Sequence, residues 1–379
     1  MYAVGLMSGT SLDGIDAVLC DINGVGIQTV VEKLAFLTLE IPFQVKEKIH
    51  KCCANEAIET ALICSLNFEL GELFAKAVLA VCEKAKIHSS ALGFVASHGQ
   101  TIYHIPRSYA EYIPSTLQIG ESAIIAQRCH CPVVSNFRCK DMAVFGEGAP
   151  LVPFSEFVLY REETKTIALQ NIGGIGNVTI LPSGGGIDDV IAFDTGPGNM
   201  MIDEAMKKLY GIPYDMDGQI ASKGKLVNAM QDELRKHPYI AIYPPKTTGR
   251  EQFGVPMTTK LLEKYKSECP ADIITTLTWF SAYTIAESYR RYVLPMYSLS
   301  EVILGGGGAH NKTLCRFLQL ELPNLHVATQ EDKGYSSDAK EAIAFVILGN
   351  QTMHHQSSNV PKATGAKQSV ILGTITYPD

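Results

Sequence analysis

Residues 2–21 read YAVGLMSGTSLDGIDAVLCD, which is an apolar run, a turn rich in glycine and hydroxyl groups, and a second apolar run. This order predicts a β-hairpin whose strands are residues 2–7 and 15–21. The same order returns at residues 166–181, TIALQNIGGIGNVTIL. Two copies of strand, glycine turn and strand predict a duplicated α/β unit with one hairpin in each of two lobes.

The bulk composition is that of a globular protein large enough for two domains. The chain has 379 residues, of which 46% are hydrophobic, and a single core rarely grows to this size. A net charge of −7 without any basic run argues against nucleic-acid or anionic-membrane partners. The chain opens directly into a predicted strand, with no signal peptide and no membrane-length apolar segment, so we expect a cytoplasmic protein.

The ten cysteines are scattered, which predicts reduced thiols and no disulfide framework. Cys129, His130 and Cys131, with Cys139 nearby, invite comparison with a zinc site. Their spacing is not that of the usual zinc pairs, and no second pair matches it. Ordinary thiols are therefore the favoured interpretation.

Helical and strand-like segments alternate between and after the hairpins. Apolar runs at 92–96 and 131–135 follow a helical pattern over 57–86, and this alternation predicts a largely parallel sheet. Glycine, proline and charged residues over 141–165 indicate the crossover between lobes. We expect an N-terminal lobe at 1–140 and a C-terminal lobe at 141–379, with the extreme C-terminus able to return to the first lobe.

The first glycine turn has the composition of an anion-binding loop. Gly9 and Gly14 let the backbone turn, Thr10 and Ser11 offer hydroxyls, and Asp13 could reach a hydrated Mg²⁺. An ordinary hairpin turn that ends in Asp-Gly is the alternative.

Asp194 follows the apolar run 190–193, at the carboxyl end of a predicted strand, where open α/β sheets place ligands. The turn 195–198 then leads into a predicted helix from Asn199. Phosphoryl-transfer sites use such an aspartate as a base or to hold a metal. The alternative is a helix N-cap worth about 1 kcal/mol.

Other candidates lie at strand ends and in loops. The run Gly305–Gly308 sits between a predicted strand and a helix, which suits a nucleotide turn or a flexible loop. His98 is a catalyst or a structural histidine. Arg138 and Arg250 suit a carboxylate or phosphate, or a surface ion pair. Glu341 begins a predicted helix, where a carboxylate is favourable in any case.

Four strings together closely resemble the anhydro-N-acetylmuramic acid kinases, bacterial enzymes of the sugar kinase, Hsp70 and actin superfamily. They are GLMSGTSLDGID at 5–16, SHGQT at 97–101, FDTGPGN at 193–199 and DAKEA at 338–342. The likeness runs nearly end to end and includes NFR at 136–138, GAPLVP at 148–153 and TGA at 364–366.

The resemblance implies an α/β fold of two RNase H-like lobes with a nucleotide cleft between them, as in actin and hexokinase. It also implies a reaction of cell-wall recycling. ATP phosphorylates O6 of 1,6-anhydro-N-acetylmuramic acid while water opens the anhydro bridge at C1, which yields N-acetylmuramate 6-phosphate.

The resemblance further implies roles for particular residues. Asp194 matches the general base and Glu341 a second acid near the substrate. The phosphate loop matches Gly9, Thr10, Ser11, Leu12, Asp13, Gly14, Ile15 and Asp16. We expect further nucleotide contacts at Gly174, Gly196, Gly306 and Gly307, and sugar contacts at His98, Thr101 and Arg138. Mg²⁺ would bridge the β- and γ-phosphates, with Asp13 as its candidate ligand.

Phe145, Glu147 and Gly254 depart from the family pattern, so they could retune the substrate pocket. Two alternatives to the family's reaction are kept: a kinase for an ordinary hexose or N-acetylhexosamine, and a nucleotide-binding regulator on the same fold. Expected partners are ATP and a sugar, with no nucleic acid or membrane. A homodimer is a possible assembly.

Overall fold

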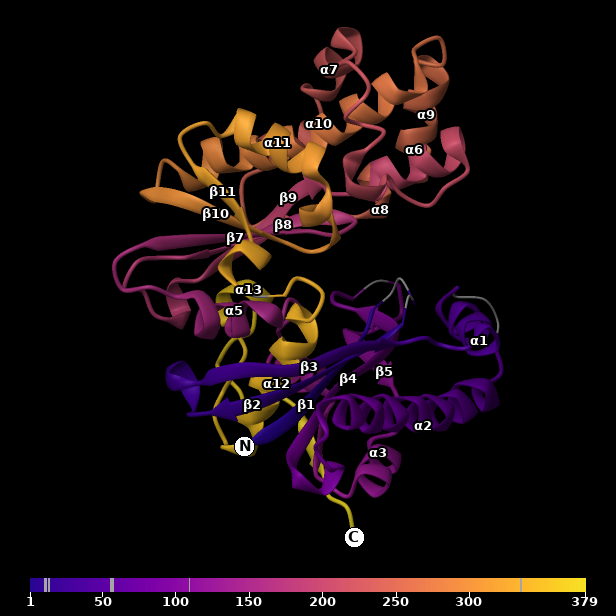
Figure 1. Ribbon diagram of the computed structural model, residues 1–379, viewed down its shortest axis with the longest axis vertical. Helices are drawn as coiled ribbons and strands as arrows, with labels where there is room; N and C mark the ends of the chain where they lie inside the picture. The colour runs from indigo at the N-terminus through magenta and orange to yellow at the C-terminus, as the bar shows by residue number, and fades with distance from the viewer. Residues whose placement is uncertain (10–11, 13, 55–57, 109, 335) are drawn as a thin grey trace. The chain divides into compact units, whose positions relative to one another are not determined.

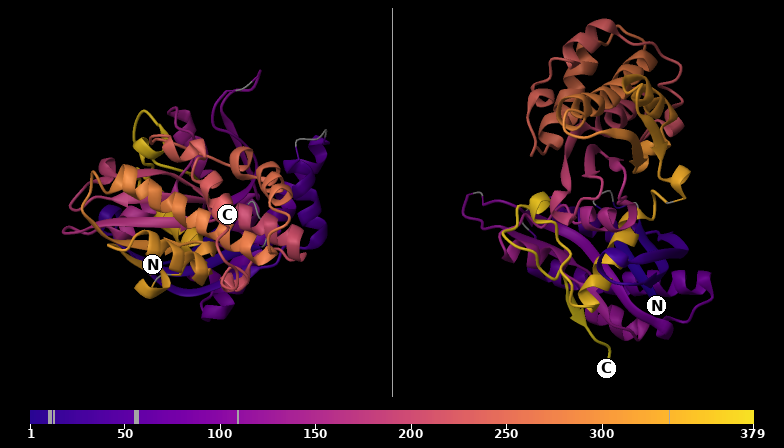
Figure 2. Two further views of the ribbon diagram at one scale, coloured as in Figure 1. Left: turned by 90° about the horizontal axis from the view of Figure 1, so that it is seen from above. Right: turned by 90° about the vertical axis from the view of Figure 1, so that its left-hand side faces the viewer.

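The computed structural model describes residues 1–379 except 10, 11, 13, 55–57, 109 and 335. The chain forms two compact units, one of residues 1–159 with 339–379 and one of residues 160–338. Each unit has its own sheet (Figure 1). Both ends of the chain belong to the first unit (Figure 2).

The sheet of the first unit has seven strands in the order β12-β6-β4-β1-β2-β3, with β5 paired to β4. The strands β1, β2 and β3 form an antiparallel meander, whereas β4 runs parallel to β1 and β6 parallel to β4. The strand bounds are β1 (Tyr2–Ser8), β2 (Ile15–Asn23), β3 (Val30–Leu39), β4 (Leu92–Ile105), β5 (Ser115–Ile119), β6 (Val133–Ser135) and β12 (Thr374–Thr376).

Helices cover both faces of this first sheet. Val4 and Leu6 of β1 share a buried core with Leu66 and Leu70 of α2. Gly5, between them, faces α12, where a Cβ would lie 2.0 Å from the Ala342 carbonyl oxygen. The helix bounds are α1 (Phe43–Cys53), α2 (Thr60–Ala85), α3 (Ser122–Cys129), α4 (Phe137–Ala143), α5 (Val152–Tyr160), α12 (Lys340–Met353) and α13 (Pro361–Thr364).

The sheet of the second unit repeats this design with five strands in the order β11-β10-β7-β8-β9. Here β7, β8 and β9 form the antiparallel meander, and β10 and β11 continue it in parallel. The strand bounds are β7 (Thr166–Ile172), β8 (Ile175–Leu181), β9 (Ile191–Pro197), β10 (Leu299–Gly305) and β11 (His326–Thr329). The order 9-8-7-10-11 matches 3-2-1-4-6 of the first unit, which confirms the duplicated α/β unit.

In the second unit, α10 and α11 lie along one face of the sheet (Figure 1). The helix bounds are α6 (Met200–Tyr210), α7 (Asn228–Leu234), α8 (Arg250–Phe253), α9 (Val255–Lys264), α10 (Pro270–Ser288) and α11 (Lys312–Glu321). Shorter 3₁₀ turns are η1 (Gly26–Gln28), η2 (Ser89–Ala91), η3 (Ile187–Asp189), η4 (Met216–Gly218), η5 (Pro238–Ala241), η7 (Gly307–His310) and η8 (Glu331–Lys333), and η6 (Tyr289–Val293) is a π-helical turn.

One detail of the predicted architecture was wrong. The sheets are mixed rather than largely parallel, because each hairpin adds a third antiparallel strand to its meander. At the C-terminal end of the chain, β12 pairs antiparallel with β6.

The prediction put the boundary near residue 140 and allowed only the extreme C-terminus to return to the first lobe, whereas residues 141–159 stay with the first unit and the whole of 339–379 returns to it. The buried Asp141 carboxylate explains part of this, because its Oδ1 accepts hydrogen bonds from Asn359 and Thr364. An ion pair of 2.5 Å between Glu156 and Lys340 joins α5 to α12.

Candidate active site

Asp194 lies within β9, where three hydrogen bonds hold its backbone and carboxylate. Its amide donates to the carbonyl oxygen of Lys246 at 3.0 Å, and its own carbonyl accepts from the Tyr239 hydroxyl at 2.8 Å. The Thr248 amide donates to Oδ2 at 2.9 Å. Asn199, not Asp194, is the residue that caps α6, so the N-cap interpretation of Asp194 was wrong.

The surroundings of Asp194 make it a stronger base than an exposed aspartate. Burial is the main cause that raises its pKa from 3.8 to about 6, opposed by the Thr248 amide and the charge of Lys246, while Glu251 adds to the rise. A carboxylate with this pKa is mostly ionised at neutral pH and can still accept a proton.

The glycine turns of the second unit converge next to this strand. The carbonyl of Gly174, in the β7–β8 turn, accepts hydrogen bonds from Gly198 at 2.9 Å and Met200 at 3.1 Å. Gly196 lies just before them at the end of β9. The side-chain amide of Asn199 donates to Ile172 at 3.5 Å.

The turn after β10 is the last of these glycine turns, and part of its backbone is accessible to a ligand. Gly306 has φ +79°, and a Cβ there would lie 2.7 Å from the side-chain oxygen of Asn171. At Gly307 a Cβ would meet only the Asn199 amide nitrogen, at 3.9 Å. Gly174 and Gly307 are both exposed, so a flat base or a phosphate can approach bare backbone at these turns.

In the first unit, Arg138 and His98 form one hydrogen-bonded pair. Arg138 donates from Nε and Nη2 to His98 Nε2 at 3.2 and 2.9 Å, and from Nη1 to the Gly148 carbonyl at 2.7 Å. His98 Nδ1 lies 2.8 Å from the Gly99 carbonyl. Burial and the Arg138 charge lower the pKa of His98 to about 3, so this imidazole is neutral and is no acid or base near pH 7.

Glu341 lies in the first turn of α12. Displacement of water by surrounding protein is the main cause that raises its pKa; Lys340 and Arg138 lower it, and Asp16 raises it. Asp16 Oδ1 accepts from the Thr38 hydroxyl at 2.6 Å. The structure therefore brings Asp16, Arg138 and Glu341 into one electrostatic group.

The predicted phosphate loop is described only in part, because Thr10, Ser11 and Asp13 lie outside the described residues. The Leu12 amide donates to the Gly9 carbonyl at 3.3 Å. Gly14 packs against Thr38 and Leu39. Ile15 is buried and pairs with Ser8 at the turn end of the hairpin.

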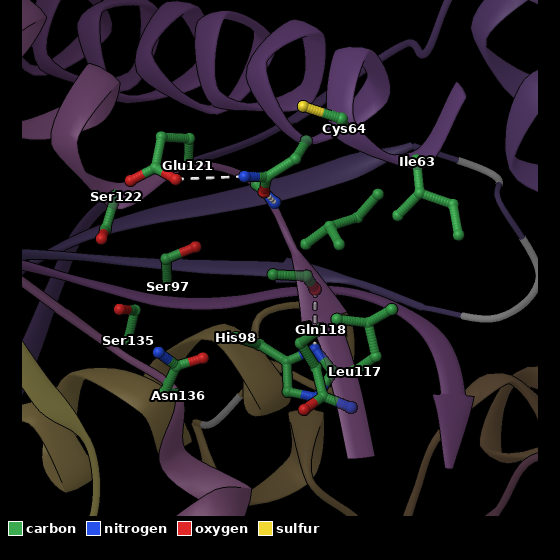
Figure 3. A pocket seen from close by; sticks show the side chains of 14 residues that line it. Ile63, Cys64, Ser97, His98, Leu117, Gln118, Glu121, Ser122, Ser135 and Asn136 are labelled. Carbon is green, nitrogen blue, oxygen red and sulfur yellow. Dashed lines mark hydrogen bonds between the residues drawn. The ribbon is translucent and has the colours of Figure 1, made fainter. Parts of the chain in front are cut away.

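A polar pocket of about 340 Å³ lies beside His98 in the first unit (Figure 3). Among its lining atoms, Ser97 Oγ and Gln118 Oε1 have no hydrogen-bond partner in the described part of the chain. Gln118 Nε2 donates to the Thr101 hydroxyl at 3.2 Å. The pocket is lined by Ile63, Cys64, Asn67, Ser97, His98, Gly99, Leu117, Gln118, Ile119, Gly120, Glu121, Ser122, Ser135 and Asn136.

Sequence reasoning missed much of this pocket. Ser97 stands in a motif-like string, but Asn67 lies on a helix and Gln118 on an edge strand, where neither has a local signal. Lys246 was missed as well. Its only sequence signal is its place between two prolines and a Thr-Thr-Gly turn.

A family model described as anhydro-N-acetylmuramic acid kinase matches residues 1–378 of this sequence. The chain belongs to the anhydro-N-acetylmuramic acid kinase family. An anhydro-N-acetylmuramic acid kinase of Clostridioides difficile strain 630 is 55% identical, over 99% of this chain and 98% of that protein. One of Bacillus cereus is 51% identical over the full length of both.

Among solved structures, an activator of 2-hydroxyisocaproyl-CoA dehydratase from Clostridium difficile with bound ADPNP aligns with a TM-score of 0.45 at 13% identity. The alignment covers 93% of this chain and 95% of that one. The family assignment rests on the sequence relatives, and it confirms the predicted family and the predicted kinase class. It supports neither the hexose-kinase nor the regulator alternative.

The three departures from the anhydro-N-acetylmuramic acid kinase pattern are Phe145, Glu147 and Gly254. Phe145 is exposed, with the Lys367 ammonium 3.7 Å from its ring centroid. Glu147 accepts a hydrogen bond from Arg107 at 2.7 Å. Gly254 is the N-cap residue of α9. None of the three lines the pocket.

Three further observations concern the thiols, groups of metal ligands and membrane-spanning helices. Burial is the main cause that raises the thiol pKa of Cys129 and of Cys131 to about 12, so both are unreactive. Within the described ranges, no three His, Cys, Asp or Glu side chains are grouped as metal ligands would be. No described helix has the length and apolar character needed to cross a bilayer.

Proposed function

We propose that Asp194 is the general base of the family's reaction, in which ATP phosphorylates O6 of 1,6-anhydro-N-acetylmuramic acid as water opens the anhydro bridge. The observation that carries this proposal is the oriented carboxylate. The Thr248 amide donates a hydrogen bond of 2.9 Å to one carboxylate oxygen of Asp194 and so orients the group. Burial raises the pKa of the Asp194 carboxyl group to about 6.

The bond changes explain why one base is enough. The water oxygen bonds to C1 as the C1–O6 bond breaks, and O6 bonds to the γ-phosphorus as the bond to the β-phosphate oxygen breaks. O6 leaves C1 with an electron pair, so it needs no base. The attacking water must lose a proton, and the Asp194 carboxylate accepts it.

We assign sugar recognition to the first unit. Arg138 presents a guanidinium suited to the lactyl carboxylate, and neutral His98 fixes its orientation through two hydrogen bonds. The polar pocket beside them offers Ser97 Oγ and Gln118 Oε1 to hydroxyl and acetamido groups, and Thr101 lies next to Gln118. Glu341 is the second acid near the substrate.

We assign nucleotide binding to the glycine turns. Open backbone at Gly174 and Gly307 fits a nucleotide, and residues 9–16 form the proposed phosphate loop. When bound with ATP, Mg²⁺ neutralises charge on the β- and γ-phosphates. Asp13 is its candidate ligand, outside the described residues, and no step above depends on it.

We also propose a cytoplasmic enzyme whose partners are ATP and the sugar, with a homodimer as the candidate assembly. All ten cysteines are free, which suits a reducing compartment. The net charge of −7 disfavours nucleic acid.

The test is a mass spectrum of the product formed from ATP and 1,6-anhydro-N-acetylmuramic acid in H₂¹⁸O. We expect a phosphosugar that carries one ¹⁸O, and no product from the Asp194→Asn variant, which should still bind ATP. An unlabelled phosphosugar would indicate phosphorylation without ring opening. Substantial turnover by Asp194→Asn would remove Asp194 from the role of base.

A further inference from the structure

Lys246 is a buried ammonium without a hydrogen-bond partner in the described part of the chain. Its side chain is 4% exposed, and no hydrogen bond reaches Nζ. Burying a charge without a partner is unfavourable, and an apolar side chain would fill the same space at lower cost. Packing alone therefore does not account for a charged side chain at this position.

Two tyrosine rings enclose this ammonium. Nζ lies 4.5 Å from the ring centroid of Tyr239 and 5.0 Å from that of Tyr292, distances at which the ring faces attract a cation. The hydroxyls of both tyrosines donate to backbone carbonyls, those of Asp194 and Ile240. The rings are thereby fixed, and they hold the ammonium without offering it a lone pair.

The same loop holds Asp194. The Lys246 carbonyl accepts the Asp194 amide at 3.0 Å, and two residues later the Thr248 amide donates to the Asp194 carboxylate at 2.9 Å. Tyr239 contacts both residues, since its ring faces the ammonium and its hydroxyl bonds to the Asp194 carbonyl. Lys246 and Asp194 are therefore connected both through the loop backbone and through Tyr239.

We propose that Lys246 is a positioning residue for Asp194, whose caged ammonium keeps the carboxylate ionised without a hydrogen bond that would occupy its oxygens. This proposal rests on the proposed function, in which Asp194 is the base. An oxygen left free by the ammonium remains available to the attacking water.

The charged groups around the pair act in opposite directions. Asp194 faces Lys246, Glu251 and Tyr239, of which Lys246 lowers its pKa and Glu251 raises it. Lys246 faces Asp194, Arg291 and the two rings; burial is the main cause that lowers its pKa to about 8, and Arg291 adds to this. The ammonium is thus charged over the range in which Asp194 titrates.

The first experiment compares pH profiles of kcat/KM for wild type and Lys246→Met, which keeps the length of the side chain and removes the charge. We expect the acid limb of the kcat/KM profile to move to higher pH by roughly one unit, because loss of the nearby positive charge raises the pKa of Asp194. Activity at pH 6 then falls about fivefold relative to wild type, because the ionised fraction drops from one half to about one eleventh, while activity at pH 8 stays close to wild type. Lys246→Arg, which keeps the charge, should restore the acid limb, and the exposed Lys236→Met serves as the matched control.

The second experiment follows the ionisation of the Asp194 carboxyl group by NMR, in the absence of catalysis. The ¹³C carboxyl signal of Asp194, assigned by its loss in Asp194→Asn, should titrate near pH 6 in wild type with a second inflection near pH 8 as Lys246 loses its proton. In Lys246→Met the first step should move up and the second vanish. The wild-type titration tests the proposal even where the variant does not fold.

An equal loss of kcat/KM at every pH in Lys246→Met, or an Asp194 signal without a Lys246-dependent step, would overturn the proposal and leave Lys246 a structural residue. Turnover by Asp194→Asn would instead refute the base assignment, and the ¹³C titration would still report on Lys246. The two failures are therefore distinguishable.

Discussion

Arg138 donates hydrogen bonds to His98 Nε2 from two of its nitrogens, Nε at 3.2 Å and Nη2 at 2.9 Å. This contact fixes the histidine as the tautomer whose Nδ1 hydrogen bonds to the Gly99 carbonyl. The histidine acts as a neutral support for a positively charged fork, so we expect the pair to bind an anion rather than transfer a proton.

Replacing Arg138 with lysine should weaken sugar binding while the charge is kept. We expect KM for the sugar to rise roughly 10- to 100-fold, because the planar fork that suits a carboxylate is lost. Steady-state kinetics with 1,6-anhydro-N-acetylmuramic acid measure this change. The matched substrate is 1,6-anhydro-N-acetylglucosamine, which lacks the lactyl group and should respond much less. An equal rise in KM for both sugars would contradict a contact between Arg138 and the carboxylate.

Asp194→Asn should make the protein more stable while it abolishes turnover. Because burial raises the folded-state pKa from 3.8 to about 6, the associated stability is fully present below pH 3.8 and is lost as pH rises through about 6. Above that pH the buried charge costs about 1–3 kcal/mol, and asparagine removes this cost. Urea unfolding of both proteins at pH 5 and pH 8 checks this, and the gain should be larger at pH 8. A gain that does not depend on pH would mean that the carboxylate is not the cause.

Gly307→Ala should leave the fold intact and weaken ATP binding. The added methyl group meets only the Asn199 amide nitrogen, at 3.9 Å, but it covers backbone that we assign to the nucleotide. We expect KM for ATP to rise severalfold with an unchanged unfolding free energy. Gly186→Ala is a matched control in a second-unit turn, because the backbone there has no positive φ and a Cβ would meet only the Asp189 carboxylate oxygen, at 3.9 Å. Unchanged ATP kinetics in Gly307→Ala would place the nucleotide elsewhere.

The ion pair between Lys340 and Glu156 should be strongly coupled. Its atoms lie 2.5 Å apart, with the side chains 9% and 5% exposed. Lys340→Met leaves Glu156 buried without its partner, so we expect a loss of about 3–5 kcal/mol in the free energy of unfolding. The double variant Lys340→Met with Glu156→Gln should recover part of this loss in urea titrations. A double variant no more stable than Lys340→Met would show that the lost charge partner is not what destabilises the protein.

Local pattern predicted the elements that carry the glycine turns. Both hairpins, the helix after Asn199 and the strand before Gly305 formed where alternation and turn residues placed them, because short-range sterics and hydrogen bonding decide such segments. The prediction allowed only the extreme C-terminus to return to the first unit, and the return of the whole of 339–379 had no comparable signal. It depends on contacts such as Asp141 with Asn359 and Thr364, which join residues far apart in the sequence.

The sequence by itself determined the duplicated hairpin, its glycine turns and the strand that carries Asp194, because each is a pattern of neighbouring residues. Its motifs also identified the family. Only the tertiary structure decided which side chains meet: Arg138 with His98, and Lys246 with Tyr239, Tyr292 and the loop of Asp194. Burial, and with it the proton affinity of Asp194, arises from atoms brought together by folding, and no stretch of sequence contains that information locally.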